Sequence, residues 1–337
     1  MSNPSPNPWQ RRVSLLLPLT VTVALLVWAW RGVSFTAVGK ALASAQLPWL
    51  VFGVLTFLPA FLFRAHRWGI LLGVQRHPGS FRLRTAAVYI GFAGNCVLPA
   101  NMGELIRVGI LHRFAGIPFA TGLGSILTAR LLDAMVAFLF LLAPLIVPNP
   151  DHSINLSRLP LPLLGGILAI LGGGFLLAAH YPGSLLQVVD RLARLTGWEG
   201  LRVKLVAVVK TLLEGLVVLR YPRLTLIAIV DTLCLWSLSG LTFWAVLIAF
   251  NLSTPGYPGA LFIQSVQAMA AIIPSTPGHL GAFEAAVRFA LEVYAIPPET
   301  IVAYTLVVRL LIYGSLTITG AICALRLGLT RADLLPR

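Results

Sequence analysis

Long apolar stretches alternate with short polar segments along the whole chain, and most of these stretches are long enough for membrane-spanning helices. A transmembrane helix takes about 20 predominantly apolar residues. The pattern therefore predicts an all-α polytopic membrane protein, in which a single transmembrane domain covers residues 1–337. The predicted full spans, about six, are residues 13–30, 48–63, 119–147, 161–180, 224–250 and 300–325.

Two further apolar stretches are shorter and are interrupted by proline and glycine. Residues 85–98 make about 21 Å of helix, too little to cross a hydrocarbon core of about 30 Å without tilting, and residues 259–273 are similarly short. We expect two re-entrant helical hairpins, although two tilted full spans in place of the first hairpin would fit the charge pattern equally well. The predicted helix breaks are Pro99 and Gly103 in the first hairpin, and Pro274, Pro277, Gly278 and Gly281 in the second.

Basic residues lie between the apolar stretches, where they indicate topology. Of the 337 residues, 58% are hydrophobic and 11% are charged, and the net charge is +14. By the positive-inside rule, Arg11 and Arg12 place the N-terminus in the cytoplasm, and Arg326 and Arg331 place the C-terminus there. Because these residues form no soluble basic face, their charge predicts contacts with lipid headgroups and no nucleic-acid binding.

The segment 184–220 has a different pattern, in which apolar residues recur at helical spacing with charged residues between them. Leu201, Leu205 and Leu212 belong to the apolar set, and Arg202 and Lys210 to the charged one. We expect an amphipathic helix on the cytoplasmic interface, drawn to anionic lipid. A short segment at 35–45 is expected in the opposite interface.

The same order of elements occurs twice: a span, a short apolar piece, a Pro-Gly break, a helix with Glu then Arg, and a span with an internal Arg. Glu104 precedes Arg130 by 130 − 104 = 26 residues, and Glu284 precedes Arg309 by 309 − 284 = 25. The charge rule orients the two units oppositely, which predicts an inverted repeat of the kind that forms a midplane site in transporters. The predicted parts are a first helix with an interfacial segment (13–45), repeat half 1 (46–147), a linking span with the amphipathic helix (161–220) and repeat half 2 (222–326).

Polar and charged side chains inside the apolar segments are the candidate substrate-binding residues. Charge within a bilayer is costly and usually functional. Arginine side chains and helix N-termini both favour anions, so the expected ligand group is a phosphate. The candidates are Asn95, Glu104, Arg107, Arg130, Asp133, Glu284, Arg288 and Arg309.

Several of these charges have an alternative explanation, which is pairing within one helix. Arg309 has no acid within a turn of its own helix, so we expect it to contact a glutamate elsewhere or the ligand phosphate. Asn95 is expected to satisfy broken backbone, and Arg64 and Arg67, which follow a predicted span, to reach the interface. The possible same-helix pairs are Glu104 with Arg107, Arg130 with Asp133, and Glu284 with Arg288.

Signatures of soluble catalytic sites are missing from the sequence. We find no phosphate-binding G-x-x-x-x-G-K-[ST], no G-x-S-x-G and no zinc-ligand spacing. Cys96, Cys234 and Cys323 lie in apolar segments and are interpreted as packing residues. We therefore expect no enzyme activity, no catalytic residue, no metal and no cofactor.

The motif around the first break, N95-x3-P99-x3-G103-E104-x2-R107, is followed by A-R130-L-L-D133 and later by P274-x2-P277-G278-x2-G281-x-F283-E284. With these motifs the chain resembles the lysylphosphatidylglycerol synthase transmembrane region family of flippase-like membrane proteins, from about residue 15 to 325. The resemblance implies an integral membrane protein of bacteria or archaea that moves or handles lipids. The soluble aminoacyltransferase domain of the best-known members has no counterpart before Arg337, so aminoacylation is not expected.

The leading hypothesis is a lipid translocase of the bacterial cytoplasmic membrane. Its cargo would be an anionic or aminoacylated phospholipid, or a lipid linked to polyprenyl phosphate, and it would pass between the inverted halves by way of Arg107, Arg288 and Arg309. Two alternatives stay open: an intramembrane lipid-modifying enzyme that uses Glu104 or Glu284, and a non-transporting partner of a lipid or glycolipid synthase. The expected partners are membrane lipids with anionic headgroups, with a lipid synthase and a second copy of the chain left open.

Overall fold

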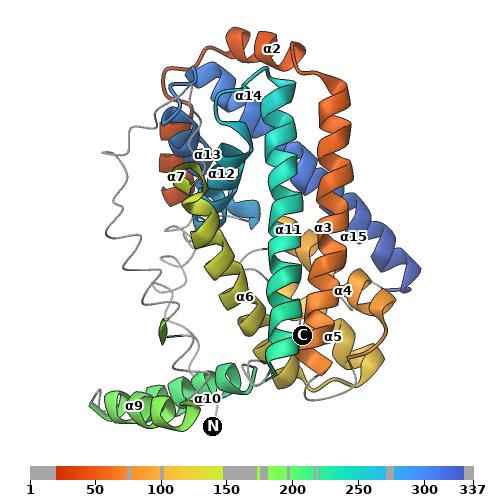
Figure 1. Cartoon of the computed structure of the whole chain (residues 1–337), viewed down its shortest axis with the longest axis vertical. Coiled ribbons are helices and arrows are strands. Elements are labelled where there is room, and N and C mark those ends of the chain that lie inside the picture. The colour runs from red at the N-terminus through yellow and green to blue at the C-terminus, as the bar shows by residue number, and fades with distance from the viewer. Residues whose placement is uncertain are drawn as a thin grey trace.

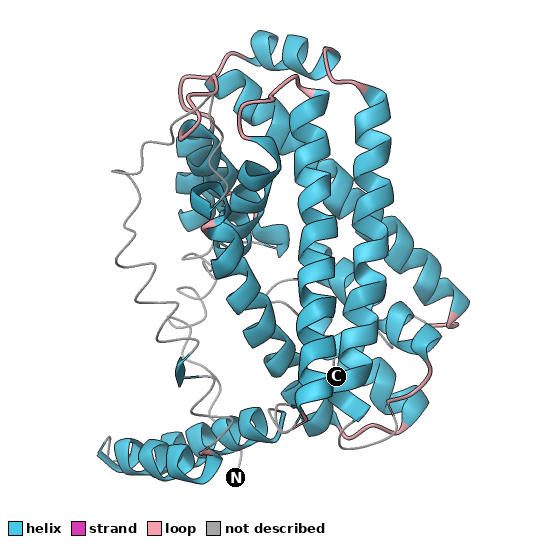
Figure 2. Ribbon diagram, viewed as in Figure 1, coloured by secondary structure: helices cyan, strands magenta, loops and turns pink. Residues whose placement is uncertain are grey.

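The structure is a computed structural model of the chain. It describes residues 20–73, 78–98, 102–146, 173–174, 181–195, 198–215, 218, 221–270 and 277–329. All regular secondary structure within these ranges is helical (Figure 2). By length and composition, the helices that could cross a membrane in this part of the chain are Leu47–Gly73, Phe119–Leu145, Pro222–Ala249 and Pro298–Arg326.

Two of the six predicted spans cannot be compared fully with the structure. Residues 161–180 lie outside the described residues, apart from a short piece at 173–174. The first predicted span, 13–30, is described from Thr20, where a short apolar helix runs to Ala29. The other four predicted spans overlap the four long apolar helices.

A pair of long antiparallel helices, α3 (Leu47–Gly73) and α11 (Pro222–Ala249), forms the centre of the fold, and the two lie side by side in Figure 1. The helices are close enough at Gly53 for Oγ1 of Thr242 to donate a 3.0 Å hydrogen bond to its backbone oxygen. The Oγ1 atoms of Thr56 and Thr242 lie 3.2 Å apart across the same contact. α3 continues ten residues beyond the predicted end of its span at Phe63, so it carries the basic residues that follow Phe63 inside a helix.

The first short apolar piece forms α4 (Phe81–Val97), and α5 (Gly103–Ala115) returns antiparallel to it. Glycine makes this contact possible, since a Cβ atom on Gly103 would lie 1.8 Å from the carbonyl oxygen of Gly91. Pro99 lies outside the described residues. After α5, the chain turns through Gly116, whose φ of 67° is left-handed, and enters α6 (Phe119–Leu141) and α7 (Ala143–Ile146).

The second short apolar piece forms α12 (Gly256–Ala270), followed by a 3₁₀ turn, η3 (Pro277–His279), and α13 (Ala282–Glu292). Pro274 lies outside the described residues. Figure 1 shows α12 and α13 towards the end of the molecule where α2 (Phe35–Ala43) lies, and α4 and α5 towards the other end. The last helix consists of α14 (Pro298–Arg309), a π-helical turn, η4 (Leu310–Gly314), and α15 (Ser315–Arg326).

The apolar core has one main cluster around each short helix pair. Phe243, Phe283 and Tyr304 are buried in the cluster that joins α13 to α11 and α14. Trp68 and Leu111 are buried in the cluster that joins α3 to α5. Each short helix pair therefore packs within its own apolar cluster.

The predicted amphipathic segment consists of two helices where one was expected, α9 (Pro182–Leu195) and α10 (Glu199–Gly215). They pack on each other at the end of the molecule opposite α2 (Figure 1). Arg202 of α10 donates a 2.7 Å hydrogen bond to Asp190 of α9. This bond and a second one from Arg194 hold the pKa of the Asp190 carboxyl below its usual value.

Candidate functional site: a buried arginine cluster

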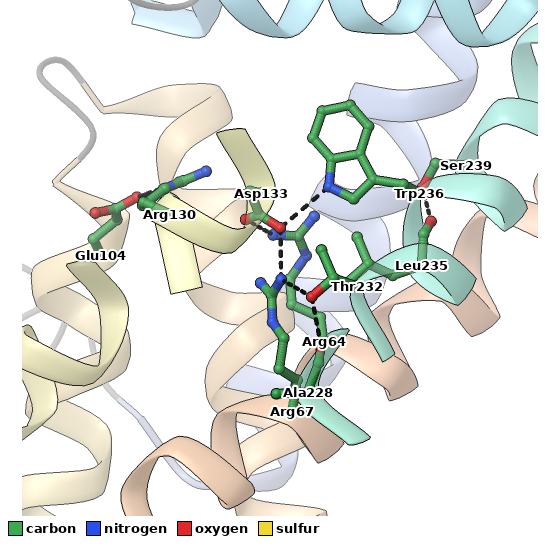
Figure 3. A network of polar contacts seen from close by, with 10 residues as sticks. All are labelled: Arg64, Arg67, Glu104, Arg130, Asp133, Ala228, Thr232, Leu235, Trp236 and Ser239. Atoms are coloured by element: carbon green, nitrogen blue, oxygen red, sulfur yellow. Dashed lines mark hydrogen bonds and ion pairs between the residues drawn. The ribbon is translucent and has the colours of Figure 1, made fainter. Parts of the chain in front are cut away.

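Asp133 of α6 is the centre of a buried polar network between three long helices (Figure 3). Its carboxylate accepts hydrogen bonds from Nη1 of Arg67 at 2.7 Å and from Nη1 of Arg64 at 3.1 Å, both on α3. Nε1 of Trp236, on α11, donates to the same carboxylate at 3.1 Å. Arg67 also donates to Oγ1 of Thr232 at 2.8 Å, and it is only 1% exposed. The network ties α3, α6 and α11 together.

A second ion pair joins Glu104 of α5 to Arg130 of α6. Nε and Nη2 of Arg130 both donate to Oε1 of Glu104. The side chains of Arg130 and Glu104 are 41% and 22% exposed, whereas that of Asp133 is 9% exposed. The polar region is therefore accessible beside Arg130 and closed around Asp133.

Arg107, one turn after Glu104 on α5, is buried and forms no ion pair with a carboxylate of the described residues. The residue is 4% exposed, and its Nε atom has no hydrogen-bond partner. Its guanidinium carbon lies 5.2 Å from the ring centre of Trp68 and 5.5 Å from that of Phe92. Contacts with aromatic faces compensate a buried cation only in part.

Phe92 of α4 is the point on which three arginines converge. The guanidinium carbons of Arg64, Arg107 and Arg130 lie 4.6, 5.5 and 5.8 Å from the centre of its ring. These three residues and Arg67 form what we call the arginine cluster. Among the described residues, the carboxylates that form ion pairs with the cluster are Glu104 and Asp133, so the paired groups leave a charge of 4 − 2 = +2. Such an excess in a low-dielectric interior attracts an anion.

The second half of the chain contains a matching ion pair. Nη1 of Arg309 donates to Oε1 of Glu284, and Nη2 donates to the backbone oxygen of Gly278. Oε2 of Glu284 accepts the backbone N–H of Gly281 at 2.7 Å, which caps α13. In both halves, the glutamate lies in the first turn of the helix after the break and the arginine lies on the next long helix.

The second break meets the end of α4 inside the protein. The left-handed φ of Gly278, 72°, places the second break against the end of α4, where a Cβ on Gly278 would lie 3.0 Å from the backbone oxygen of Cys96. His279, the next residue, lies close enough to both Arg309 and Arg130 to interact with them electrostatically. The Glu104–Arg130 and Glu284–Arg309 pairs thus lie on either side of one junction.

The possible same-helix ion pairs do not form, because partners on neighbouring helices replace them. Glu104 pairs with Arg130 instead of Arg107, and Glu284 pairs with Arg309 instead of Arg288. Asp133 pairs with arginines of α3 rather than with Arg130. These charges therefore connect helices, and within the described residues Arg107 is the member of the cluster that forms no ion pair with a carboxylate.

Two candidate residues have local roles. Arg288 donates from Nη1 to the backbone oxygens of Trp28, Ala29 and Arg31, and from Nε to Glu292. It caps the end of the helix Thr20–Ala29, away from the arginine cluster. The Oδ1 atom of Asn95 is buried without a hydrogen-bond partner, and a Cβ on Gly103 would lie 2.5 Å from it, so Asn95 lies directly at the first break.

Arg64 and Arg67 are the site residues that sequence reasoning assigned wrongly. They were expected to reach the interface at the end of a span, but α3 continues past them to Gly73 and buries Arg67 completely. Their i, i+3 spacing puts them on one helix face, and an isolated Asp133 in an apolar segment was the available sign of a partner. Thr232 and Trp236 carried no comparable signal.

Among the described residues, no group of three or more His, Cys, Asp and Glu side chains is arranged to hold a metal ion. The polar atoms that converge on the cluster are mainly guanidinium nitrogens, which are donors and bind anions.

Comparison with known proteins agrees with this architecture. The family described as "Lysylphosphatidylglycerol synthase TM region" matches residues 15–320. One UPF0104 membrane protein of Methanothermobacter thermautotrophicus is 24% identical over 319 residues, 91% of this chain and 90% of the relative. Another from that organism is 24% identical over 281 residues, 78% of each chain. A UPF0104 membrane protein of Methanocaldococcus jannaschii is 26% identical over 239 residues, 68% of this chain and 91% of the relative.

The family match covers most of the sequence, and it agrees with the four helices that are long and apolar enough to cross a bilayer. The protein is therefore an integral membrane protein, and the chain belongs to the lysylphosphatidylglycerol synthase transmembrane region family.

Proposed function

We propose that this protein is a lipid translocase, which carries a lipid with an anionic headgroup across the membrane. The observation that carries the proposal is the charge excess of the arginine cluster. A charge of +2 within a membrane protein is costly unless an anion neutralises it, and a phosphate group supplies one negative charge with several acceptor oxygens. An anionic or aminoacylated phospholipid, or a polyprenyl-phosphate-linked lipid, presents such a group.

The phosphate would bind beside Phe92, between Arg64, Arg107 and Arg130. Arg107 supports this position most strongly, since its Nε is buried and has no hydrogen-bond partner. Arg130 offers the way in, because its side chain is 41% exposed. Arg67 is held by Asp133 and Thr232, so we assign it to the framework.

Movement across the membrane would use the two ion pairs in turn. We infer that the short helix pairs α4–α5 and α12–α13 are re-entrant hairpins of an inverted repeat. Their matching Glu104–Arg130 and Glu284–Arg309 pairs and their meeting at Gly278 support this. A phosphate that reaches either arginine competes with its glutamate, and a freed glutamate can contact a cationic group on the lipid. Arg288 has no part in this path.

The family description also supports a lipid as the cargo, because lysylphosphatidylglycerol is an aminoacylated phospholipid. The family description supports only the substrate class, a lipid. The anionic character of the headgroup is inferred from the arginine cluster alone.

Transbilayer movement of fluorescent phosphatidylglycerol in phosphatidylcholine vesicles tests the proposal. We expect the wild-type protein to move the label to the protected leaflet, and Arg107→Gln to slow this movement at least tenfold, because the loss of a charged hydrogen bond costs about 1.5–3 kcal/mol. Arg82→Gln on the exposed side of α4 is the matched control and should behave as the wild type.

Equal rates for the wild type and Arg107→Gln, with both proteins folded by circular dichroism and gel filtration, would refute the proposed site. A new lipid species in the vesicles, detected by mass spectrometry, would instead support a lipid-modifying enzyme. Vesicles in which the purified chain moves no lipid at all would favour a role as a partner of a synthase.

A further inference from the structure

His66 and Asp231 form an acid–base pair that the proposed lipid path does not use. Nδ1 of His66, on α3, lies 2.7 Å from Oδ2 of Asp231, on α11. The histidine side chain is 52% exposed, and the aspartate side chain is 7% exposed. A histidine whose one nitrogen is held by a carboxylate and whose other nitrogen is accessible is arranged to take up a proton.

The pair shares both of its helices with the arginine cluster. His66 lies between Arg64 and Arg67 in the sequence R-A-H-R of α3. On α11, Asp231 directly precedes Thr232, which accepts a hydrogen bond from Arg67 (Figure 3). The pair therefore adjoins Arg67, the member of the arginine cluster that interacts electrostatically with Asp231.

Few other charged groups surround the pair in the described part of the chain. Arg67 of α3 is the further charged neighbour of Asp231, and α6 contributes Asp133, which binds Arg67. The titratable groups that contact α11 from α12 and α14 lie further along it. Tyr257 and Tyr304 donate their hydroxyls to the backbone oxygens of Ser237 and Phe243.

The position of His66 gives its imidazole access to protons from one side. It lies 73 − 66 = 7 residues before the end of α3, or about 10 Å along the helix axis. In the tautomer whose Nδ1 donates to Asp231, Nε2 of the neutral imidazole has a lone pair. A proton bound at Nε2 converts the pair into an imidazolium held by a carboxylate, with one added positive charge.

We propose that the His66–Asp231 pair is a proton-binding site coupled to headgroup binding at the arginine cluster, an inference that rests on the proposed function. An anion between Arg64, Arg107 and Arg130 cancels positive charge of the cluster to which Arg67, the charged neighbour of Asp231, belongs, so it favours protonation of Nε2. By linkage, protonation favours binding of the anion to the same extent. Lipid and proton are therefore bound together.

Binding of short-chain phosphatidylglycerol to the purified full-length protein in detergent, followed from pH 5.5 to 8, tests this coupling. The phosphodiester keeps its charge over this range, so the protein supplies the pH dependence. We expect the wild-type affinity to rise towards low pH, by at most about tenfold per pH unit for one coupled proton. Phosphatidylcholine serves as the lipid without net charge.

The histidine variants identify the group responsible. His66→Gln should bind phosphatidylglycerol with an affinity that no longer changes with pH. His112→Gln, in the last turn of α5, should keep the wild-type dependence. His279 interacts electrostatically with Arg130 and Arg309, so it is the competing titratable group, and His279→Gln tests it separately. Proton uptake on lipid addition, measured with an indicator dye in weak buffer, should be present in the wild type and lost in His66→Gln.

Two results would overturn the coupling while leaving the proposed function intact. One is a wild-type affinity that does not change with pH, and the other is a pH dependence that survives His66→Gln or disappears in His279→Gln. If the proposed function is wrong, the wild type and Arg107→Gln should bind phosphatidylglycerol with equal affinity. That result would also refute the coupling.

Discussion

Arg107 should be a residue that the protein retains for binding at the expense of its own stability. The residue is 4% exposed, pairs with no carboxylate in the described part of the chain and has an Nε atom without a hydrogen-bond partner. Replacing it by methionine keeps much of the side-chain volume and removes the charge. We therefore predict that Arg107→Met makes the protein more stable in the absence of lipid.

The magnitude follows from two opposing contributions. Burial of an unpaired cation costs several kcal/mol after relaxation. The contacts with Trp68 and Phe92, at 5.2 and 5.5 Å, each return about 0.5–2 kcal/mol. The net gain on removal is then about 1–3 kcal/mol, which corresponds to a rise of about 2–6 °C in the apparent melting temperature of a chain of this size.

Thermal unfolding in detergent at one fixed scan rate, followed by circular dichroism, measures this difference. Short-chain phosphatidylglycerol at a hundred times its dissociation constant should stabilise the wild type by about 2.7 kcal/mol and leave Arg107→Met unchanged. Arg67→Met is the matched control and should lower the melting temperature, because it removes a partner of Asp133 and of Thr232. A melting temperature lowered equally by both substitutions would refute the reasoning.

Two further predictions concern the first helix pair. If the Glu104–Arg130 pair joins α5 to α6, each single variant, Glu104→Arg or Arg130→Glu, should lower the free energy of unfolding by about 1–3 kcal/mol. The double variant, in which the two charges are exchanged, should restore the stability. A double-mutant cycle of thermal unfolding that shows no coupling would refute the pairing. Gly103→Ala should prevent close packing of α4 on α5, because its Cβ would lie 1.8 Å from the oxygen of Gly91. The yield of folded protein in gel filtration should therefore fall. Gly109→Ala, whose Cβ would meet no atom within 4 Å, should keep the wild-type yield.

The long helices could be predicted from the sequence because hydrophobicity over about 20 residues is a local property. The end of α3 could not be predicted, because Arg64 and Arg67 interrupt the apolar pattern. Their burial is compensated by pairing with Asp133 on another helix, which the local sequence does not show. A hydrophobic window treats these arginines as the end of a span. In the structure, they continue the helix towards Gly73.

The ion-pair partners of the charged residues also could not be predicted from the sequence, because they depend on contacts between helices. The separations of 26 and 25 residues between Glu and Arg were visible in the sequence, and they indicated a repeat. That Glu104 contacts Arg130 follows only when α5 packs antiparallel to α6, which brings the beginning of one helix beside the middle of the other. The spacing along α5 predicted Arg107 as the partner of Glu104, whereas packing between α5 and α6 makes Arg130 the partner.

The π-helical turn after Arg309 determines the directions in which Arg309 and Gly320 face on the last helix. Arg309 faces α13, where it contacts Phe283, and Gly320 faces α4, where it lies against Ala93. The two residues are 320 − 309 = 11 apart, which in an unbroken α-helix is about three turns, so both would face the same direction. The turn Leu310–Gly314 holds one additional residue and rotates the two faces about a quarter turn apart. One helix can thereby serve both helix pairs at once.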